Sequence, residues 1–331
     1  MRTPRLPLIL LLAGAPLAGA TGAPEAARER TPVVLVSDIG TDIDDSWALA
    51  LALRSPELDL KLVVVDPVDT PYRAAVAAKF LEAAGRADVP VGIGDNHGPT
   101  GDDNKTLALW IAGYDIAKYP GRVYADGVGA LIDVVEKSPR PVTVVAIGPV
   151  WSLALALGRA PDIAAKCRLV GMFGSFDAGY DGGPPSAEFN VKVNPAGLRA
   201  VLAAPWRDIL LTPLDTCGRV SLGGERYHAI WSATSDPMLR ALIQSYCVFA
   251  PRQNWMLCDF FAVRSTTLYD CVAVYLAYSE DLVETETIPF EVTDDGFTRR
   301  TAAGPLRARV AIRWRSRDGF EAQLAGRLLG R

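Results

Sequence analysis

Short apolar runs alternate with amphipathic or alanine-rich stretches along most of the chain. The apolar runs, many of them rich in β-branched residues, predict buried strands at residues 33–36, 60–65, 89–93, 141–147, 168–173 and 208–211. The stretches between them predict helices at residues 46–53, 72–84, 127–137 and 152–157. Strands that alternate with helices in this order predict an α/β fold, with a mostly parallel central sheet flanked by helices on both faces.

The last third of the chain follows a less regular pattern. Residues 307–314 (RARVAIRW) place arginines on one face and Val310, Ile312 and Trp314 on the other, which is typical of a half-exposed or edge strand. No low-complexity stretch or linker divides the chain after residue 30, so residues 31–331 are predicted to form a single domain. Ligands of mostly parallel sheets bind beyond the carboxyl ends of the strands, so polar residues directly after a strand are the first candidates for a site.

The first 23 residues have the pattern of a signal peptide. Arg2 and Arg5 precede an apolar stretch at residues 8–15, and Ala18-Gly19-Ala20 supplies small residues for cleavage. The apolar stretch is shorter than the roughly 20 residues that a membrane-spanning helix needs. An uncleaved anchor or a disordered tail is the alternative. We expect residues 1–23 to be removed and the mature protein to be exported, periplasmic or secreted, with no membrane association after cleavage.

Composition excludes several classes of function. The chain has 331 residues, half of them apolar and 22% charged, which is enough for a large core. The net charge of −4 comes from 34 basic and 38 acidic residues without a basic run, so nucleic acid is a poor partner. His97 and His228 are the only histidines, which leaves no His-based zinc site of the usual type. The five cysteines form no C-x-x-C motif, which excludes a zinc knuckle, a thioredoxin motif and a dense disulfide scaffold.

The strongest chemical signal is the acidic loop after the first predicted strand. Residues 33–45 read VVLVSDIGTDIDD and place Asp38, Asp42, Asp44 and Asp45 within eight positions. Carboxylates this close repel one another unless a cation or a proton neutralises them. A divalent cation with oxygen ligands would do so, and Ca²⁺ takes six to eight of them. The alternative is a solvated acidic turn that caps the following helix, but capping needs only one or two carboxylates.

The loop and four further segments resemble the inosine–uridine-preferring nucleoside hydrolase family, the N-ribohydrolases. The loop matches the family signature through Asp38, Gly40 and the pair Asp44-Asp45. The other resembling segments, in the family's order, are residues 146–155 (AIGPVWSLAL), 187–190 (AEFN) with Asn194-Pro195, 268–270 (LYD) and the tail from 292 to 328. The resemblance covers most of the chain beyond residue 30. It implies a nucleoside hydrolase-like domain with a Rossmann-like core.

The resemblance also implies an activity and roles for particular residues. The implied reaction is Ca²⁺-dependent hydrolysis of the N-glycosidic bond of ribonucleosides to free base and ribose. Asp38 would be both a metal ligand and the general base that activates the attacking water. The implied site residues are Asp38, Asp45, Asp270 and a backbone carbonyl near Ile147 for the metal, and Asp44, Glu188, Asn190 and Tyr269 for the substrate. Homodimers or homotetramers are common in the family.

Three of these residues have simpler explanations that stay open at this point. Glu188 and Asn190 together could satisfy local backbone groups in a loop. Asp270 precedes the apolar run CVAVYLAY and could be the N-cap of a helix, a role compatible with metal binding.

The sequence also departs from the family pattern at three places. Gly182 stands where family members commonly carry an asparagine, and Tyr269 replaces a histidine that protonates the leaving base in some members. Asp66-Pro67 replaces the usual Gly-Asn after the second strand, with Asp69 close by. A phenol with a pKa of ~10 donates a proton less readily at neutral pH than an imidazole does.

Three functions therefore remain open. The favoured one is the exported, Ca²⁺-dependent ribonucleoside hydrolase. The second keeps the metal and the sugar contacts but cleaves another N-ribosyl or glycosidic substrate. The third is a non-catalytic nucleoside- or sugar-binding protein on the same scaffold.

Overall fold

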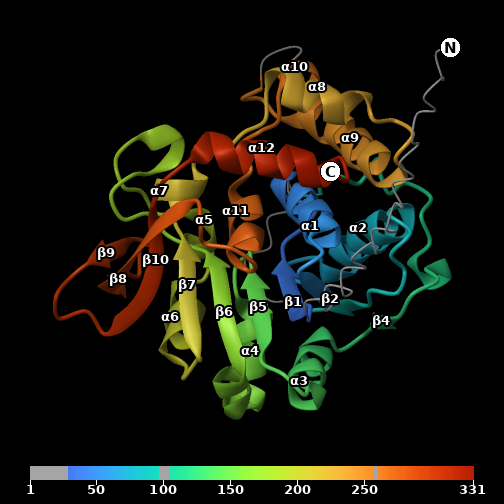
Figure 1. The fold of residues 1–331 in the computed structure, drawn as a ribbon. Helices are drawn as coiled ribbons and strands as arrows, with labels where there is room; N and C mark the ends of the chain where they lie inside the picture. Colours follow the sequence, from blue (N-terminus) through green and yellow to red (C-terminus); the bar gives the residue numbers. More distant parts are fainter. Residues whose placement is uncertain (1–28, 97–104, 257–259) are drawn as a thin grey trace, which may run out of the picture.

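Figure 1 shows the computed structural model, which describes residues 29–96, 105–256 and 260–331. The predicted signal peptide, His97 and Cys258 lie outside these residues. No helix among the described residues is long and apolar enough to cross a membrane.

A single ten-stranded sheet runs through the described part of the chain. Its strands lie in the order β4-β3-β2-β1-β5-β6-β7-β10-β8-β9. Their bounds are β1 Thr31–Ser37, β2 Leu58–Val65, β3 Val91–Ile93, β4 Val123–Tyr124, β5 Val142–Ala146, β6 Cys167–Met172, β7 Asp208–Thr212, β8 Val283–Val292, β9 Thr298–Arg300 and β10 Leu306–Trp314. All neighbours from β4 to β10 pair in parallel, and β8 pairs antiparallel with both β10 and β9. The predicted mostly parallel sheet is confirmed.

Helices cover both faces of the sheet (Figure 1). The α-helices are α1 Asp44–Arg54, α2 Thr70–Ala83, α3 Gly127–Lys137, α4 Trp151–Arg159, α5 Phe189–Val193, α6 Pro195–Ala203, α7 Leu214–Cys217, α8 Gly224–Ser232, α9 Pro237–Phe249, α10 Phe260–Val263, α11 Tyr269–Leu276 and α12 Arg317–Leu328. Short 3-10 turns are η2 Ile116–Lys118, η3 Pro161–Lys166, η4 Tyr180–Gly182 and η5 Ala250–Arg252. Side chains of α1, α2, α9, α11 and α12 share one core, and those of α3, α4 and α6 share the other.

The two cores follow from the alternation of side chains along a buried strand. In β1, Val33 and Leu35 belong to the core on one face, whereas Val34 and Val36 belong to the core on the other. Both faces are buried, so the strand is apolar at every one of these positions, which is why it appears in the sequence as a continuous run.

The order of the strands creates a crevice between β1 and β5. The chain proceeds from β1 outward to β2, β3 and β4, and then returns to pair β5 with the other edge of β1. Loops that leave β1 and β5 therefore diverge to opposite sides at the carboxyl ends of these two strands. Such a switch point is where open α/β sheets bind ligands.

The carboxyl-terminal third contains one correction and one omission. β10 lies between β7 and β8, so the edge-strand alternative for residues 307–314 is wrong, while half-exposure is confirmed because Arg307 and Arg313 are exposed. The pattern analysis did not predict α8 and α9. Asp236 accepts from the backbone N–H groups of Met238 and Leu239, and Pro237 opens α9, which is an N-terminal signature readable in the sequence.

Candidate active site

A cavity of about 240 Å³ opens at the carboxyl ends of the central strands. Its walls are polar at the base and aromatic toward the mouth. It is lined by Asp38, Thr41, Asp42, Asp44, Asp45, Ile147, Met172, Tyr180, Glu188, Phe189, Asn190, Tyr269 and Asp270. Every site residue predicted from the sequence lies in this lining. The four sequence blocks, which are up to 230 positions apart, therefore meet at one place.

Asp38 is delivered to the cavity by the end of β1. The residue directly follows the strand, and its side chain is buried with 7% of its surface exposed. Gly148, which lies just after β5, makes room for it, since a Cβ there would be 2.7 Å from Asp38 Oδ1. The glycine of the Gly148-Pro149 pair is thus required by the close approach of the Asp38 carboxylate.

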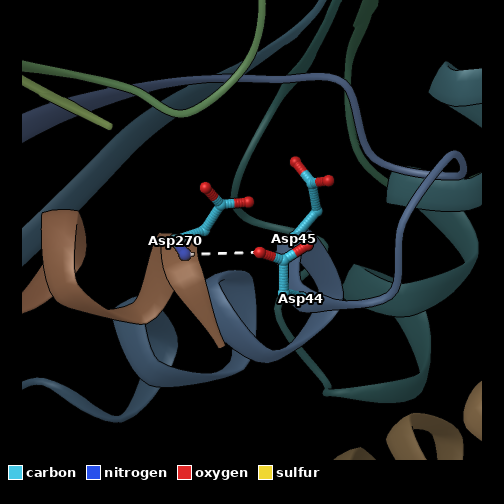
Figure 2. Close-up of side chains that lie close together, drawn as sticks. All are labelled: Asp44, Asp45 and Asp270. Carbon is cyan, nitrogen blue, oxygen red and sulfur yellow. Dashed lines mark hydrogen bonds between the residues drawn. The ribbon is translucent and has the colours of Figure 1, made fainter. Parts of the chain in front are cut away.

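Three carboxylates from two helices converge beside it (Figure 2). Asp44 and Asp45 form the first turn of α1 and Asp270 lies in the first turn of α11, with one oxygen of each within 4.8 Å of the others. The Asp270 backbone N–H donates to Asp44 Oδ2 at 3.4 Å, and the Ser37 hydroxyl donates to Asp45 Oδ1 at 2.5 Å. The amino ends of two helices both favour negative charge at this point.

The N-cap alternative for Asp270 is wrong. Leu268 occupies the N-cap of α11, and Asp270 is the second residue of that helix. Its carboxylate therefore turns toward Asp44 and Asp45 and is available to the cavity.

Burial and mutual repulsion raise the pKa of these carboxyl groups. For Asp44, Asp45 and Asp270, burial raises the pKa well above its ordinary value, and the neighbouring aspartates raise it further. Burial raises the pKa of Asp38 to about 6, with Arg73 acting in the opposite direction. A bound divalent cation would remove the repulsion that these shifts report.

Glu188 and Asn190 bond to backbone groups and also face the cavity. The Glu188 carboxylate caps α5 and accepts from the backbone N–H groups of Gly174 (3.1 Å), Asn190 (2.8 Å) and Val191 (3.2 Å). Burial raises its pKa to about 7. The Asn190 amide nitrogen donates to the Ile147 carbonyl at 3.3 Å and to the Met172 carbonyl at 3.2 Å. The predicted local role is therefore found for Glu188, whereas the Asn190 side chain bonds to the ends of two distant strands. These bonds fix both side chains in the lining of the cavity.

The mouth of the cavity is aromatic. Tyr180 and Tyr269 pack edge to face with ring centroids 6.1 Å apart, and Phe189 is 45% exposed beside them. The Phe189 N–H donates to the Tyr180 hydroxyl at 2.9 Å. Burial raises the pKa of Tyr269, so its phenol is protonated at neutral pH. Tyr180 and Phe189 were missed in the sequence. Their signal was only proximity, since Phe189 lies inside the AEFN block and Tyr180 opens the Gly-rich stretch before it.

The departures from the family pattern have structural counterparts. Gly182 has a φ of +75°, and the Arg219 guanidinium lies over it, with Nε 3.0 Å from the place of a Cβ. The Asp66 carboxylate accepts from the N–H and the hydroxyl of Ser152, both at 2.9 Å, and Asp69 pairs with Lys105. Neither Asp66 nor Asp69 is among the residues that line the cavity.

Fold and site together define a class of protein. A doubly covered α/β sheet holds a buried carboxylate cluster at its switch point, with oxygen ligands suited to a divalent cation and an aromatic mouth suited to a planar ligand. This arrangement is typical of an enzyme that binds a small polar molecule over a metal.

The family follows from sequence comparison. The model of the inosine-uridine preferring nucleoside hydrolases matches residues 33–320. The chain belongs to this family, and it is a nucleosidase-type enzyme, an N-glycosyl hydrolase. Membership of this family favours the two enzyme hypotheses over the hypothesis of a non-catalytic binding protein.

Individual relatives agree with this assignment. The chain is similar to the non-specific ribonucleoside hydrolase RihC of Escherichia coli strain SE11, with 31% identity over 234 residues, 61% of this chain and 72% of that protein. RihC of Klebsiella pneumoniae is likewise 31% identical over 235 residues, 66% of this chain and 72% of that protein.

Solved structures share the fold. A plant nucleoside hydrolase, PpNRh1, has a TM-score of 0.73 at 23% identity and covers 91% of this chain and 99% of its own. The inosine-uridine preferring nucleoside hydrolase of Bacillus anthracis has a TM-score of 0.71 at 23% identity, covering 90% of this chain and 99% of its own.

Proposed function

We propose that this protein hydrolyses the N-glycosidic bond of ribonucleosides to free base and ribose, and that it requires Ca²⁺. The observation that carries the proposal is the convergence in one cavity of Asp38, the three-carboxylate cluster and the pair Glu188 and Asn190. The names of the similar RihC proteins, non-specific ribonucleoside hydrolases, support this substrate class.

The donor set fits a calcium ion. We assign Asp38, Asp45, Asp270 and the Ile147 carbonyl as ligands, all of them oxygen donors that line the same cavity. Carboxylates combined with a carbonyl favour Ca²⁺ over Mg²⁺, which keeps most of its water. When bound, the ion would neutralise the carboxylates and make a coordinated water molecule more acidic. Asp44, the third member of the cluster, is left to hold a sugar hydroxyl.

The protein's own side chains have distinct roles in this proposal. Asp38, which lines the cavity, accepts the proton of the attacking water. Asp44, Glu188 and Asn190 hold the ribose hydroxyls and thereby orient the sugar carbon toward that water. Tyr269, protonated at neutral pH, donates a hydrogen bond or a proton to the leaving base.

One observation favours a second candidate, another N-ribosyl or glycosidic substrate. Tyr269 at the mouth replaces an imidazole, and the Arg219 guanidinium covers Gly182 where a sugar-binding side chain is common in the family. Tyr269 lines the cavity, whereas Gly182 and Arg219 are not among its lining residues, so the change at Tyr269 is the one that bears on the leaving group.

We also propose that residues 1–23 direct export to the periplasm or the medium and that the mature enzyme is a homodimer or homotetramer. Amino-terminal sequencing of the exported protein tests the first point. Gel filtration of the mature protein tests the second.

The test of function is incubation of the mature protein with a panel of ribonucleosides, with and without a chelator. We expect release of free base and ribose that stops on chelation and returns with Ca²⁺. Release from another N-riboside alone would support the second candidate. No release from any of them, in protein shown to contain Ca²⁺, would contradict the proposal.

A further inference from the structure

The backbone of the acidic loop is held from behind, on the side away from the cavity. The carbonyl oxygens of four consecutive residues, 38 to 41, all accept hydrogen bonds from side chains. The donors come from only two places, the first turn of α2 and Thr106. A loop whose carbonyls all have partners behind it is fixed in the orientation of its side chains.

Arg73 supplies the first two of these bonds. Its Nη1 donates to the carbonyl of Asp38 and, at 3.2 Å, to that of Ile39. The side chain is buried, with 4% of the residue's surface exposed. Within the described residues it forms no ion pair, although buried arginines usually pair with a carboxylate. Its hydrogen-bonding capacity is spent on backbone carbonyls instead.

The same guanidinium also holds the neighbouring loop after β2. Arg73 Nε donates to the carbonyls of Pro67 at 2.5 Å and Val68 at 2.9 Å. Val68 and Asp69 have φ values of 49° and 53°, in the left-handed region that non-glycine residues rarely adopt. A conformation of this kind persists only where its surroundings enforce it. Arg73 thus joins two loops, one of which carries Asp38 and the other of which is strained.

Tyr72 and Thr106 complete the support. The Tyr72 hydroxyl donates to the Gly40 carbonyl at 2.9 Å and accepts from the Leu107 N–H at 2.9 Å. The Thr106 hydroxyl lies 2.9 Å from the carbonyls of both Gly40 and Thr41. Gly40 has a φ of +102°, and a Cβ on it would be 2.9 Å from the Tyr72 ring. The glycine of the acidic loop is therefore required by contact with α2.

We propose that the first turn of α2 positions Asp38 for catalysis, with Arg73 as the principal positioning residue and Tyr72 as the second. This inference rests on the proposed role of Asp38. Arg73 does not touch the cavity, and it acts by holding the Asp38 peptide so that the carboxylate faces the water and the metal. A planar guanidinium reaches both loops at once because its donors are spread over three nitrogens, whereas the three donors of a lysine ammonium share one atom.

The decisive variant is Arg73→Lys, which keeps the charge and loses the fork. We expect kcat to fall about 10- to 100-fold with KM changed less than about threefold, because a small misplacement of a reacting group is costly while the sugar contacts remain. We also expect the Ca²⁺ dissociation constant, measured by calorimetry without substrate, to rise about tenfold, since partners that orient metal ligands have effects of this size.

The matched control is Arg168→Lys, at the amino end of β6 and away from the cavity. Arg168 is a half-buried arginine, bonded to Asp208, Glu280 and the Leu276 carbonyl. A structural effect of losing a guanidinium would lower the melting temperature of both variants. Only Arg73→Lys is expected to change kcat and Ca²⁺ affinity per folded molecule.

Wild-type kcat and Ca²⁺ affinity in folded Arg73→Lys would overturn the inference. If that variant does not fold, Tyr72→Phe decides, with a several-fold fall in kcat expected and an unchanged kcat counting against the inference. If the wild-type enzyme hydrolyses no nucleoside, the proposed function fails, and the Ca²⁺ affinity of Arg73→Lys still shows whether the first turn of α2 positions the ligand.

Discussion

The two ends of the parallel strands differ in how their charges are balanced. Near the amino ends of the strands, Arg168 and Arg309 each pair with both Asp208 and Glu280. Two positive and two negative groups therefore form a closed ring. At the carboxyl ends of the strands, Asp38, Asp44, Asp45 and Asp270 are more deeply buried. Arg73 acts against the raised pKa of Asp38 and Asp45. Arg73 donates its hydrogen bonds to carbonyls rather than to these carboxylates.

The difference separates a structural use of charge from a functional one. A balanced ring needs nothing further from solution and stabilises the strands that it joins. An unbalanced cluster is unfavourable until a cation binds, so the fold retains it at a cost in stability. We therefore expect that removing a charge from the aspartate cluster reduces activity, whereas removing one from the ring reduces stability.

Asp38→Asn should have the largest effect. The amide keeps the shape of the side chain but cannot accept the proton of the attacking water, so kcat should fall at least about 10³-fold. The melting temperature should hold or rise, because a buried carboxylate in a repulsive cluster has been removed.

The control for Asp38→Asn is Asp208→Asn in the ring, which should lower the melting temperature and leave kcat unchanged. Near-wild-type turnover in Asp38→Asn would refute the assignment of Asp38 as the general base.

Asp270→Asn should weaken Ca²⁺ binding about 10- to 100-fold, because it removes one anionic ligand from the site. Activity should return at high Ca²⁺ concentration if the loss is one of affinity. Calorimetric titration and the Ca²⁺ dependence of kcat measure the two effects separately. An unchanged dissociation constant would exclude Asp270 from the ligand set.

Stability without the metal should depend on pH in a defined direction. The pKa values of Asp38 and Glu188 are raised in the folded protein, from 3.8 to about 6 and from 4.5 to about 7. The folded state therefore binds more protons than the unfolded state between about pH 4 and 7, and its stability falls as the pH rises through this window. For Asp38 alone the loss approaches about 3 kcal/mol.

Denaturant unfolding in a chelator at pH 5 and pH 7.5 checks this direction. Stabilisation by added Ca²⁺ should be larger at pH 7.5, where the carboxylates are ionised. Greater metal-free stability at pH 7.5 than at pH 5 would mean that other groups dominate the titration.

The sequence predicted which side chains line this cavity better than it predicted the residues that support them. Asp38 and Asp45 could be identified because carboxylates directly after a buried strand and at a helix start form a local pattern. Asp270 was found only through its sequence block, since its local pattern indicated an N-cap instead. Glu188 was found only through its sequence block, since its partners are backbone N–H groups that no pattern records. Arg73 was missed because it lies in an alanine-rich helix and its acceptors are carbonyls 5 to 35 positions away.

The parallel half of the sheet was predictable for a related reason. Strands buried on both faces appear as continuous apolar runs, and helices follow them at short intervals. The exception within this logic is α9, whose cap was readable but whose place over α1 and α2 depends on tertiary contacts. Local patterns predict elements, whereas the positions of loops and caps depend on contacts distant in sequence.

The smallest effect is expected from a substitution in the charge-balanced ring. Arg309→Leu opens the ring and leaves Asp208 and Glu280 with Arg168 alone, at a site that is partly exposed. We expect a loss of about 1 kcal/mol in unfolding free energy, since partly solvated pairs contribute little individually. Neither kcat nor Ca²⁺ affinity should change, because the ring lies near the amino ends of the strands, opposite the cavity. Arg309→Leu combined with Asp208→Leu removes one charge of each sign and should be less destabilising than the two single losses added together. A fall in kcat in Arg309→Leu would show that the ring and the aspartate cluster are coupled through the strands. The separation of structural from functional charge would then be wrong.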